Sequence, residues 1–230
     1  MKTFSTLLRW DLILLHRNQL IIVSAVLAGV YLGLFYLLKE LGSLEKILVL
    51  LIFNDPVVTG LLFAGVLVLF EKDQHTLEAL AVSPLSPEAY LWSKAVSLTI
   101  VALGTSLAMA WAGYGWQFNY VHFVVGVISA SLTFIFVGCW LVPPTISFNQ
   151  FLVRCIPLLI LMALPFIPFF EAASPMWFYP IPSYPGILLL QATFEELSFS
   201  LLVYAYCYAG LTIIGSYYLA RNSFRKHIWS

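Results

Sequence analysis

Long apolar segments separated by short polar ones dominate the pattern of this chain. An apolar stretch of about 17–25 residues can cross the hydrocarbon layer of a membrane as an α-helix. Six stretches meet or approach this length: Leu20–Leu38, Ile47–Phe70, Ala95–Trp111, Val121–Leu141, Cys155–Phe170 and Leu197–Ala220. The pattern therefore predicts an all-α integral membrane protein, with six transmembrane helices in a single domain over residues 1–230.

Two of the predicted spans contain residues that interrupt a regular helix. The fifth contains three prolines, at 157, 165 and 168, which predict a kink or a break. The second is interrupted by Asn54-Asp55-Pro56. Asp55 and Pro56 are typical of an N-cap and a first-turn proline, which would place Asp55 near the outer surface. The alternative is a direct role for Asp55 in a substrate pathway or gate, because a carboxylate inside a bilayer is costly and usually functional.

Two further segments lie outside the predicted spans. Residues 1–18 carry an apolar stripe at helical spacing, which predicts a helix on the cytoplasmic membrane surface; a plain lead-in to the first span is the alternative. Asp11 falls inside that stripe. The outer loop, residues 171–196, is rich in proline up to Gly186. Gly186–Phe194 is apolar but too short to span, so it dips into the membrane as a half-helix or lies on the outer surface.

The polar block at residues 71–93 is the largest of the loops that we expect on the cytoplasmic side. Gln74–Val82 has a helical pattern with Leu77, Leu80 and Ala81 on one face, and Pro84 ends it. Ser86 and Pro87 then predict an N-cap and the first position of a helix that continues into the third span. The apolar face of the short helix either enters a groove on a soluble partner or rests on lipid headgroups.

Composition and charge support a membrane protein and set its orientation. The chain is 61% hydrophobic and 10% charged, far from the values of soluble domains, and its zero net charge indicates no nucleic-acid partner. The three cysteines lack the spacing of a metal site. With six spans, one side carries two basic residues, Lys39 and Lys46. The other carries nine: Lys2, Arg9, Arg17, Lys72, Lys94, Arg154, Arg221, Arg225 and Lys226. This bias predicts that both termini and the 71–93 loop are cytoplasmic.

The stretch EKDQHTLEALAVSPLSPEAYLWSK resembles the first cytoplasmic loop of ABC type-2 exporter permeases. Their pattern E-x-x-x-x-T-L-E-x-L-x-x-S/T-P is matched by Glu71, Thr76, Leu77, Glu78, Leu80, Ser83 and Pro84. His75 stands where the family often has glycine. The resemblance implies the type V exporter fold and a coupling helix that docks on a separate ATP-binding subunit. Within the family, FNDPVVTGLLFAGVLVLFEKDQHTLEALAVSPLSP is most similar to small bacterial drug-export permeases of the fluoroquinolone type.

The resemblance implies a permease subunit of an ATP-driven exporter in a prokaryotic plasma membrane, moving a hydrophobic or amphipathic, drug-like or lipid-like molecule. The chain has no G-x-x-x-x-G-K-S/T phosphate loop, so ATP and Mg²⁺ would be held by the partner ATPase and this chain would be neither an enzyme nor a cofactor carrier. A second copy or a paralogue would complete the unit. The alternatives are an ATP-independent carrier or channel, or a permease of the haem-exporter type.

Candidate functional residues fall into two groups. The expected ATPase-coupling residues are Glu71, His75, Thr76, Leu77, Glu78, Leu80, Ser83 and Pro84. The expected residues of a substrate pathway or gate are Asn54, Asp55, Phe63 and Tyr204, which combine an intramembrane carboxylate with aromatic side chains that suit an apolar cargo.

Overall fold

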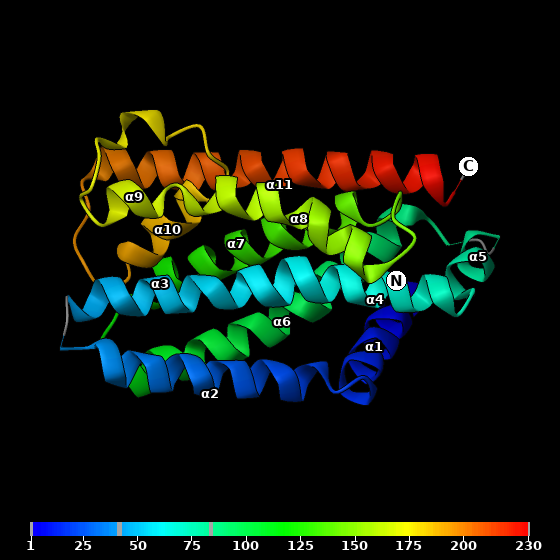
Figure 1. The fold of residues 1–230 in the computed structure, drawn as a ribbon, viewed down its shortest axis with the longest axis horizontal. Coiled ribbons are helices and arrows are strands. Elements are labelled where there is room, and N and C mark those ends of the chain that lie inside the picture. Colours follow the sequence, from blue (N-terminus) through cyan, green and yellow to red (C-terminus); the bar gives the residue numbers. More distant parts are fainter. Residues whose placement is uncertain (1, 41–42, 83–84, 230) are drawn as a thin grey trace.

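The computed structural model describes residues 2–40, 43–82 and 85–229, and every regular element in these ranges is helical. Figure 1 shows the long helices running side by side in an elongated bundle. Six helical segments are long and apolar enough to cross a membrane: Leu20–Leu38, Leu44–Asp73, Pro87–Gly113, Tyr120–Leu141, Phe148–Phe169 and Phe199–His227. The prediction of an all-α integral membrane protein with six spans is confirmed.

The bundle has two distinct ends (Figure 1). Helix α1 (Lys2–Arg17), the short helix α5 (Thr76–Ala81) and the C-terminal part of α11 (Phe199–His227) lie at one end, which we call the α5 end. The short helices α9 (Phe166–Phe169) and α10 (Tyr184–Gln191) lie near the other, the α10 end.

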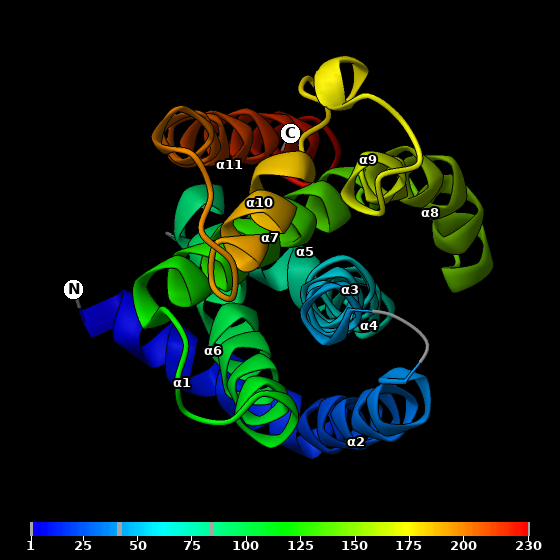
Figure 2. The same cartoon turned by 90° about the vertical axis from the view of Figure 1, so that its left-hand side faces the viewer.

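Helix α7 (Tyr120–Leu141) forms the centre of the bundle (Figure 2). It packs against α11, α10, α6 (Pro87–Gly113) and the second span. In the most apolar 18-residue window, 67% of α7 is buried, against 22% for α2 (Leu20–Leu38), for the fifth span and for α11. The outward faces of these three peripheral spans are therefore available to lipid, which solvates apolar side chains without penalty.

The second span is continuous, which corrects the prediction that Asp55 caps it. Helix α3 (Leu44–Pro56) leads into a π-helical segment, η1 (Val57–Leu62), and then into α4 (Phe63–Asp73). Ser43, not Asp55, lies at the N-cap position. Proline has no N–H to donate, so Pro56 disrupts the regular ladder, and the chain continues by widening into a π turn instead of starting a new helix.

Close packing holds this widened segment against α7. A Cβ atom on Gly60 would lie 2.9 Å from the Cβ atom of Phe134, and one on Gly138 would lie 2.6 Å from the carbonyl oxygen of Leu61. Both glycines therefore permit an approach of the two helices that a larger residue would prevent.

The fifth span also differs from its predicted bounds. Helix α8 (Phe148–Ala163) begins seven residues before the predicted start, with the Ser147 hydroxyl accepting a hydrogen bond from the Gln150 amide at 3.3 Å. The helix ends before Pro165, and α9 follows, so the predicted break is confirmed. Residues at the start of α8 are polar enough to resemble a loop in sequence, yet the N-cap allows them to be helical.

The structure places a helix start at Ser86-Pro87 and a short helix within residues 171–196. Helix α6 begins at Pro87, and the Ser86 hydroxyl accepts a hydrogen bond from the Ala89 amide at 3.2 Å, as the N-cap prediction required. Helix α10 packs inside the bundle against α7 and α11, with Tyr184 to Leu190 buried. The outer apolar segment is therefore a short helix covered by the bundle, and its depth in a membrane stays a prediction.

Candidate functional site

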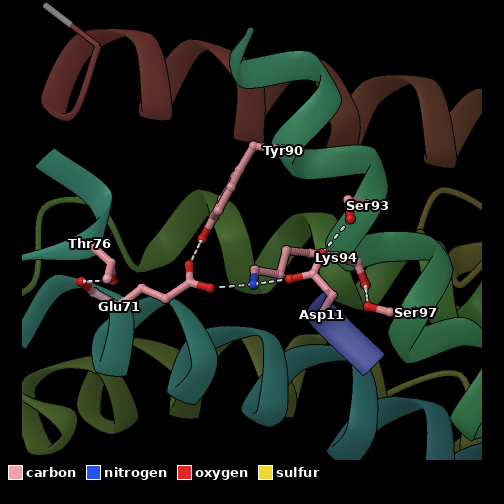
Figure 3. A network of polar contacts seen from close by, with 7 residues as sticks. All are labelled: Asp11, Glu71, Thr76, Tyr90, Ser93, Lys94 and Ser97. Carbon is pink, nitrogen blue, oxygen red and sulfur yellow. Dashed lines mark hydrogen bonds and ion pairs between the residues drawn. The ribbon is translucent and has the colours of Figure 1, made fainter. Parts of the chain in front are cut away.

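A buried ionic network lies at the α5 end, where three helices meet (Figure 3). Lys94 of α6 is 1% exposed, and its ammonium group pairs with Glu71 of α4 and, at 2.5 Å, with Asp11 of α1. The Tyr90 hydroxyl donates to the second Glu71 oxygen, and the Ser93 hydroxyl donates to the second Asp11 oxygen. Each of the four carboxylate oxygens therefore accepts a hydrogen bond from α6.

The network is stable only as a complete set. An ion taken out of water loses several kcal/mol of hydration, which a buried pair recovers only with good geometry and added hydrogen bonds. Here one ammonium faces two carboxylates, and the two hydroxyls of α6 stabilise the excess negative charge. The arrangement fixes α1, α4 and α6 to one another directly beside the 71–90 loop.

The start of that loop is held by further polar contacts. The Lys72 ammonium donates to the carbonyl oxygens of Pro143, at 2.9 Å, and Thr145, at 2.7 Å. The Thr76 hydroxyl donates to the Glu71 carbonyl at 2.7 Å, and His75 between them has a left-handed backbone, with φ 55°. Helix α5 is thus attached to the end of α4 by a fixed turn and follows any movement of it.

The return of the loop is attached to the last helix. The Glu88 carboxylate accepts hydrogen bonds from Arg221 at 2.7 Å and from Arg225 at 2.6 Å. The Trp229 indole donates to the Leu85 carbonyl at 3.3 Å. The loop therefore contacts the second, third and sixth spans together.

An apolar cavity lies within the bundle, between the second span, α7 and the α8–α9 segment. Its volume is about 300 Å³, the lower end of the range for pockets that hold small molecules. It is lined by Phe53, Asn54, Val57, Val58, Leu62, Phe134, Leu159, Met162, Ala163 and Phe166. Asn54 is the single polar residue of this lining. One N–H of its amide donates to the Leu50 carbonyl at 2.8 Å, and among the described residues its side-chain oxygen accepts no hydrogen bond.

Asp55 lies on a different face of the same helix turn from the cavity. It is 0% exposed, and its Oδ2 atom accepts hydrogen bonds from the hydroxyls of Thr105 at 2.5 Å and Ser106 at 3.4 Å, both on α6. Its Oδ1 atom has no hydrogen-bond partner among the described residues. The second and third spans therefore make a second polar contact inside the bundle. It lies further from the α5 end than the Lys94 network does (Figure 1).

Sequence comparisons relate the chain to known proteins. A sequence model of the fluoroquinolones export permease protein family matches residues 2–230. The chain belongs to this family. Two curated relatives, fluoroquinolones export permease proteins from two strains of Mycobacterium tuberculosis, are each 30% identical to it over 150 residues. The match covers 63% of this chain and 62% of each relative, so this chain spans about three fifths of the length of the relatives that it matches.

Membership of the export permease family agrees with the resemblance to ABC type-2 permeases and with a multi-pass membrane transport subunit. The coupling role of the 71–90 loop stays a prediction, and the structure shows that the bundle covers the apolar face of α5. Leu77 is 1% exposed in the core of the permease itself, and Leu80 is partly buried against the same core. A short amphipathic helix next to its own bundle buries its apolar face there before any partner arrives.

Of the other predicted coupling residues, some make contacts within the permease and others are exposed at its surface. Glu71 is buried in the Lys94 network and so is not available to a partner, whereas Thr76 is exposed and its hydroxyl holds the turn. His75 and Glu78 are exposed and lie 3.2 Å apart. Val82, which was not predicted, is 88% exposed beside them. Ser83 and Pro84 lie outside the described residues.

The predicted pathway residues are not gathered at one place. Asn54 lines the cavity, and Asp55 contacts α6 behind it. Phe63 is buried in the main core. The Tyr204 hydroxyl donates to the Tyr179 carbonyl at 2.5 Å, within a separate aromatic cluster that includes Tyr184 and Tyr208.

Sequence reasoning did not predict the roles of Asp11 and Lys94 in the network. The sequence does contain a sign of these roles, since each is a charged residue within an otherwise apolar helical face. Asp11 looked like a flaw in an apolar stripe, and Lys94 looked like a basic residue flanking a span. Two such exceptions of opposite charge are the pattern to expect of a buried ion pair.

Proposed function

We propose that this chain is the permease subunit of an ATP-driven exporter that moves amphipathic, drug-like molecules out of the cytoplasm. The α5 end would face the cytoplasm and meet a separate ABC ATP-binding subunit, which would hold ATP and Mg²⁺. The observation that carries the proposal is the Lys94 network, because it joins the 71–90 loop rigidly to two spanning helices and to α1. Family membership supports the transport role.

The contacts suggest how a partner's movement would reach the membrane. The exposed face formed by His75, Glu78 and Val82, which we call the docking face, would contact the ATPase. A force on it passes through the fixed turn to Glu71 and from there to Lys94 on α6. Because the network is buried among closely packed helices, the force would displace whole helices and not only the loop.

The cavity suggests the class of cargo. Aromatic and branched apolar side chains surround it, and Asn54 supplies one amide group. Such a lining favours a flat aromatic molecule with a hydrogen-bonding group at one edge. Fluoroquinolones, which the names of the relatives mention, have this chemistry. A volume of about 300 Å³ is small for a drug pathway, so a second copy or a paralogue is proposed to complete it.

The test uses the permease co-expressed with a candidate ABC ATP-binding subunit from the same genome and reconstituted in lipid nanodiscs. The variant Glu78→Lys/Val82→Asp alters the docking face without touching the core. The matched control is Trp177→Asp, which alters a side chain 83% exposed towards the other end of the bundle. Copurification of the ATPase and fluoroquinolone-stimulated ATP hydrolysis are measured for all three proteins.

The proposal expects the docking-face variant to lose both copurification and stimulated hydrolysis, while Trp177→Asp keeps both. Equal binding of the ATPase by all three proteins would overturn the assignment of the docking face. Fluoroquinolone export from vesicles by the permease alone, without ATP, would overturn the ATP-driven exporter and identify an independent carrier.

A further inference from the structure

The turn that contains Asp55 has two functional faces. Asn54, Val57 and Val58 point to the cavity, whereas Asp55 points to α6 and accepts hydrogen bonds from Thr105 and Ser106. Successive helical residues are rotated by about 100°, so the direction of one side chain fixes the direction of its neighbours. Whatever holds the Asp55 carboxylate therefore also sets which atoms face the cavity.

At this turn the regular backbone hydrogen bonds of the α-helix are interrupted. Pro56 supplies no N–H, and η1 follows it directly. A π turn replaces regular helical hydrogen bonds by a wider and rarer arrangement, found mostly at functional sites. The Thr59 hydroxyl donates to the Asp55 carbonyl at 2.7 Å, and the two hydroxyls of α6 bind its carboxylate. Side-chain contacts thus supply the restraint that the backbone lacks.

Two polar side chains on one face of α6, Lys94 and Thr105, contact the second span. Lys94 and Thr105 are eleven residues apart, which brings them to within about 20° of one another around the helix, roughly 16 Å apart along its axis. Lys94 binds Glu71 and Thr105 binds Asp55. The second span is therefore fixed to α6 at both ends of the stretch that includes η1, and a displacement of α6 reaches the cavity wall through Asp55.

We propose that Asp55 is a positioning residue that determines cargo selectivity, because its hydrogen bonds with Thr105 and Ser106 hold Asn54 and Val58 towards the cavity. The inference rests on the proposed function in one respect, that the cavity holds cargo. Asp55 itself touches no cargo. Its role is hydrogen-bond acceptance, which an asparagine oxygen can also perform.

The experiment compares Thr105→Val/Ser106→Ala, which removes both donors, with Thr99→Val on the same helix. Thr99 is a matched control, because its buried hydroxyl has no hydrogen-bond partner among the described residues. Asp55→Asn and Asp55→Ala complete the set. The first readout is the maleimide-labelling rate of a Val58→Cys reporter, with the three native cysteines replaced by serine. This readout needs neither cargo nor ATPase.

The second readout is the KM of fluoroquinolone-stimulated ATP hydrolysis, together with the ratio of kcat/KM for a small and a bulky fluoroquinolone. The donor-deficient variant and Asp55→Ala are expected to change the labelling rate severalfold. They are also expected to raise KM by about tenfold, because Asn54 would no longer be held towards the cargo and one hydrogen bond to the cargo would be lost. Thr99→Val and Asp55→Asn are expected to keep the labelling rate and the KM of the unaltered protein.

Each contrary result has a distinct meaning. An unchanged labelling rate in the donor-deficient variant overturns the positioning role, even where Asp55→Ala fails to fold. An effect of Asp55→Asn equal to that of Asp55→Ala also overturns it and assigns the function to the carboxylate charge. A changed labelling rate with unchanged KM and selectivity leaves the helix restraint in place but overturns cargo selectivity and, with it, the cavity as the cargo site.

Discussion

Lys94 stabilises the α5 end, because its ammonium group pairs with two buried carboxylates. The variant Lys94→Met leaves Asp11 and Glu71 buried without a cation. Breaking a buried pair in this way costs about 3–5 kcal/mol. At about 2–4 °C per kcal/mol, we expect the unfolding temperature of the purified permease in detergent to fall by about 6–20 °C. Fluorescence-monitored thermal unfolding measures the change.

A charge-free version of the network provides the control for Lys94. The triple variant Lys94→Met/Asp11→Asn/Glu71→Gln removes the two orphaned charges and keeps acceptors for Tyr90 and Ser93. It should unfold well above the single variant, because no uncompensated ion remains in the core. A triple variant that is no more stable than Lys94→Met would mean that steric packing, and not charge balance, explains the loss.

A second prediction at this scale concerns the polar atom of the cavity. Asn54→Leu removes the one amide from an otherwise apolar lining. For a cargo that hydrogen-bonds to it, we expect KM for fluoroquinolone transport into inside-out vesicles to rise about tenfold. Phe63→Leu is the comparison, since Phe63 is buried in the core away from the cavity. It should lower stability but not KM; a similar KM increase in both variants would contradict the assignment of the cavity.

At the scale of helices, the contact between η1 and α7 depends on the absence of side chains. Gly138→Ala would place a Cβ atom 2.6 Å from the Leu61 carbonyl oxygen, and backbone atoms cannot move away as a side chain can. Overpacking of this kind costs about 1–3 kcal/mol. Gly104→Ala on α6 meets no atom within 4 Å and should be neutral. Chemical denaturation of both variants in mixed micelles tests the difference, which vanishes if the helices can separate freely.

The same element shows where sequence reasoning succeeds and where it stops. The number of spans, the break at Pro165 and the start of α6 at Ser86-Pro87 follow from local rules of hydropathy and capping. Asp55-Pro56 satisfies the same capping rule but lies inside a helix. Local rules could not decide this case, because the π turn is stabilised by Thr105 and Ser106, fifty residues away in the chain.

The 71–90 loop also shows where local sequence rules succeed and where they fail. The periodicity of residues 74–82 identified a helix and its apolar face correctly, since Leu77 and Leu80 do lie on one side. Periodicity cannot say what covers that face. The structure shows that the bundle covers it, and the proposed contact with a partner therefore uses the polar side with His75 and Glu78. The Lys94 network was equally out of reach, because its three charged residues come from three separate segments.

Considered as a whole, the molecule places its polar restraints at three levels along the bundle axis. The Lys94 network and the Glu88 pair with Arg221 hold the α5 end. Asp55 with Thr105 holds the interior beside the cavity. Lys46 in the first turn of α3 pairs with Glu171, and this hydrogen bond holds the pKa of the exposed Glu171 carboxyl below its usual value. The interior around these restraints is closely packed, as expected of a bundle whose helices move as units.

The orientation of the bundle in the membrane is the last prediction, and it decides whether the docking face can meet a cytoplasmic ATPase. Nine basic residues against two predict the α5 end inside the cell. We expect a membrane-impermeant maleimide added to intact cells to label Trp177→Cys and not Val82→Cys, in a background without native cysteines. Both side chains are more than 80% exposed, so accessibility on the protein itself is matched. Inside-out vesicles should reverse the result. Labelling of Val82→Cys in intact cells would place the docking face outside, where no ATP-binding subunit could reach it.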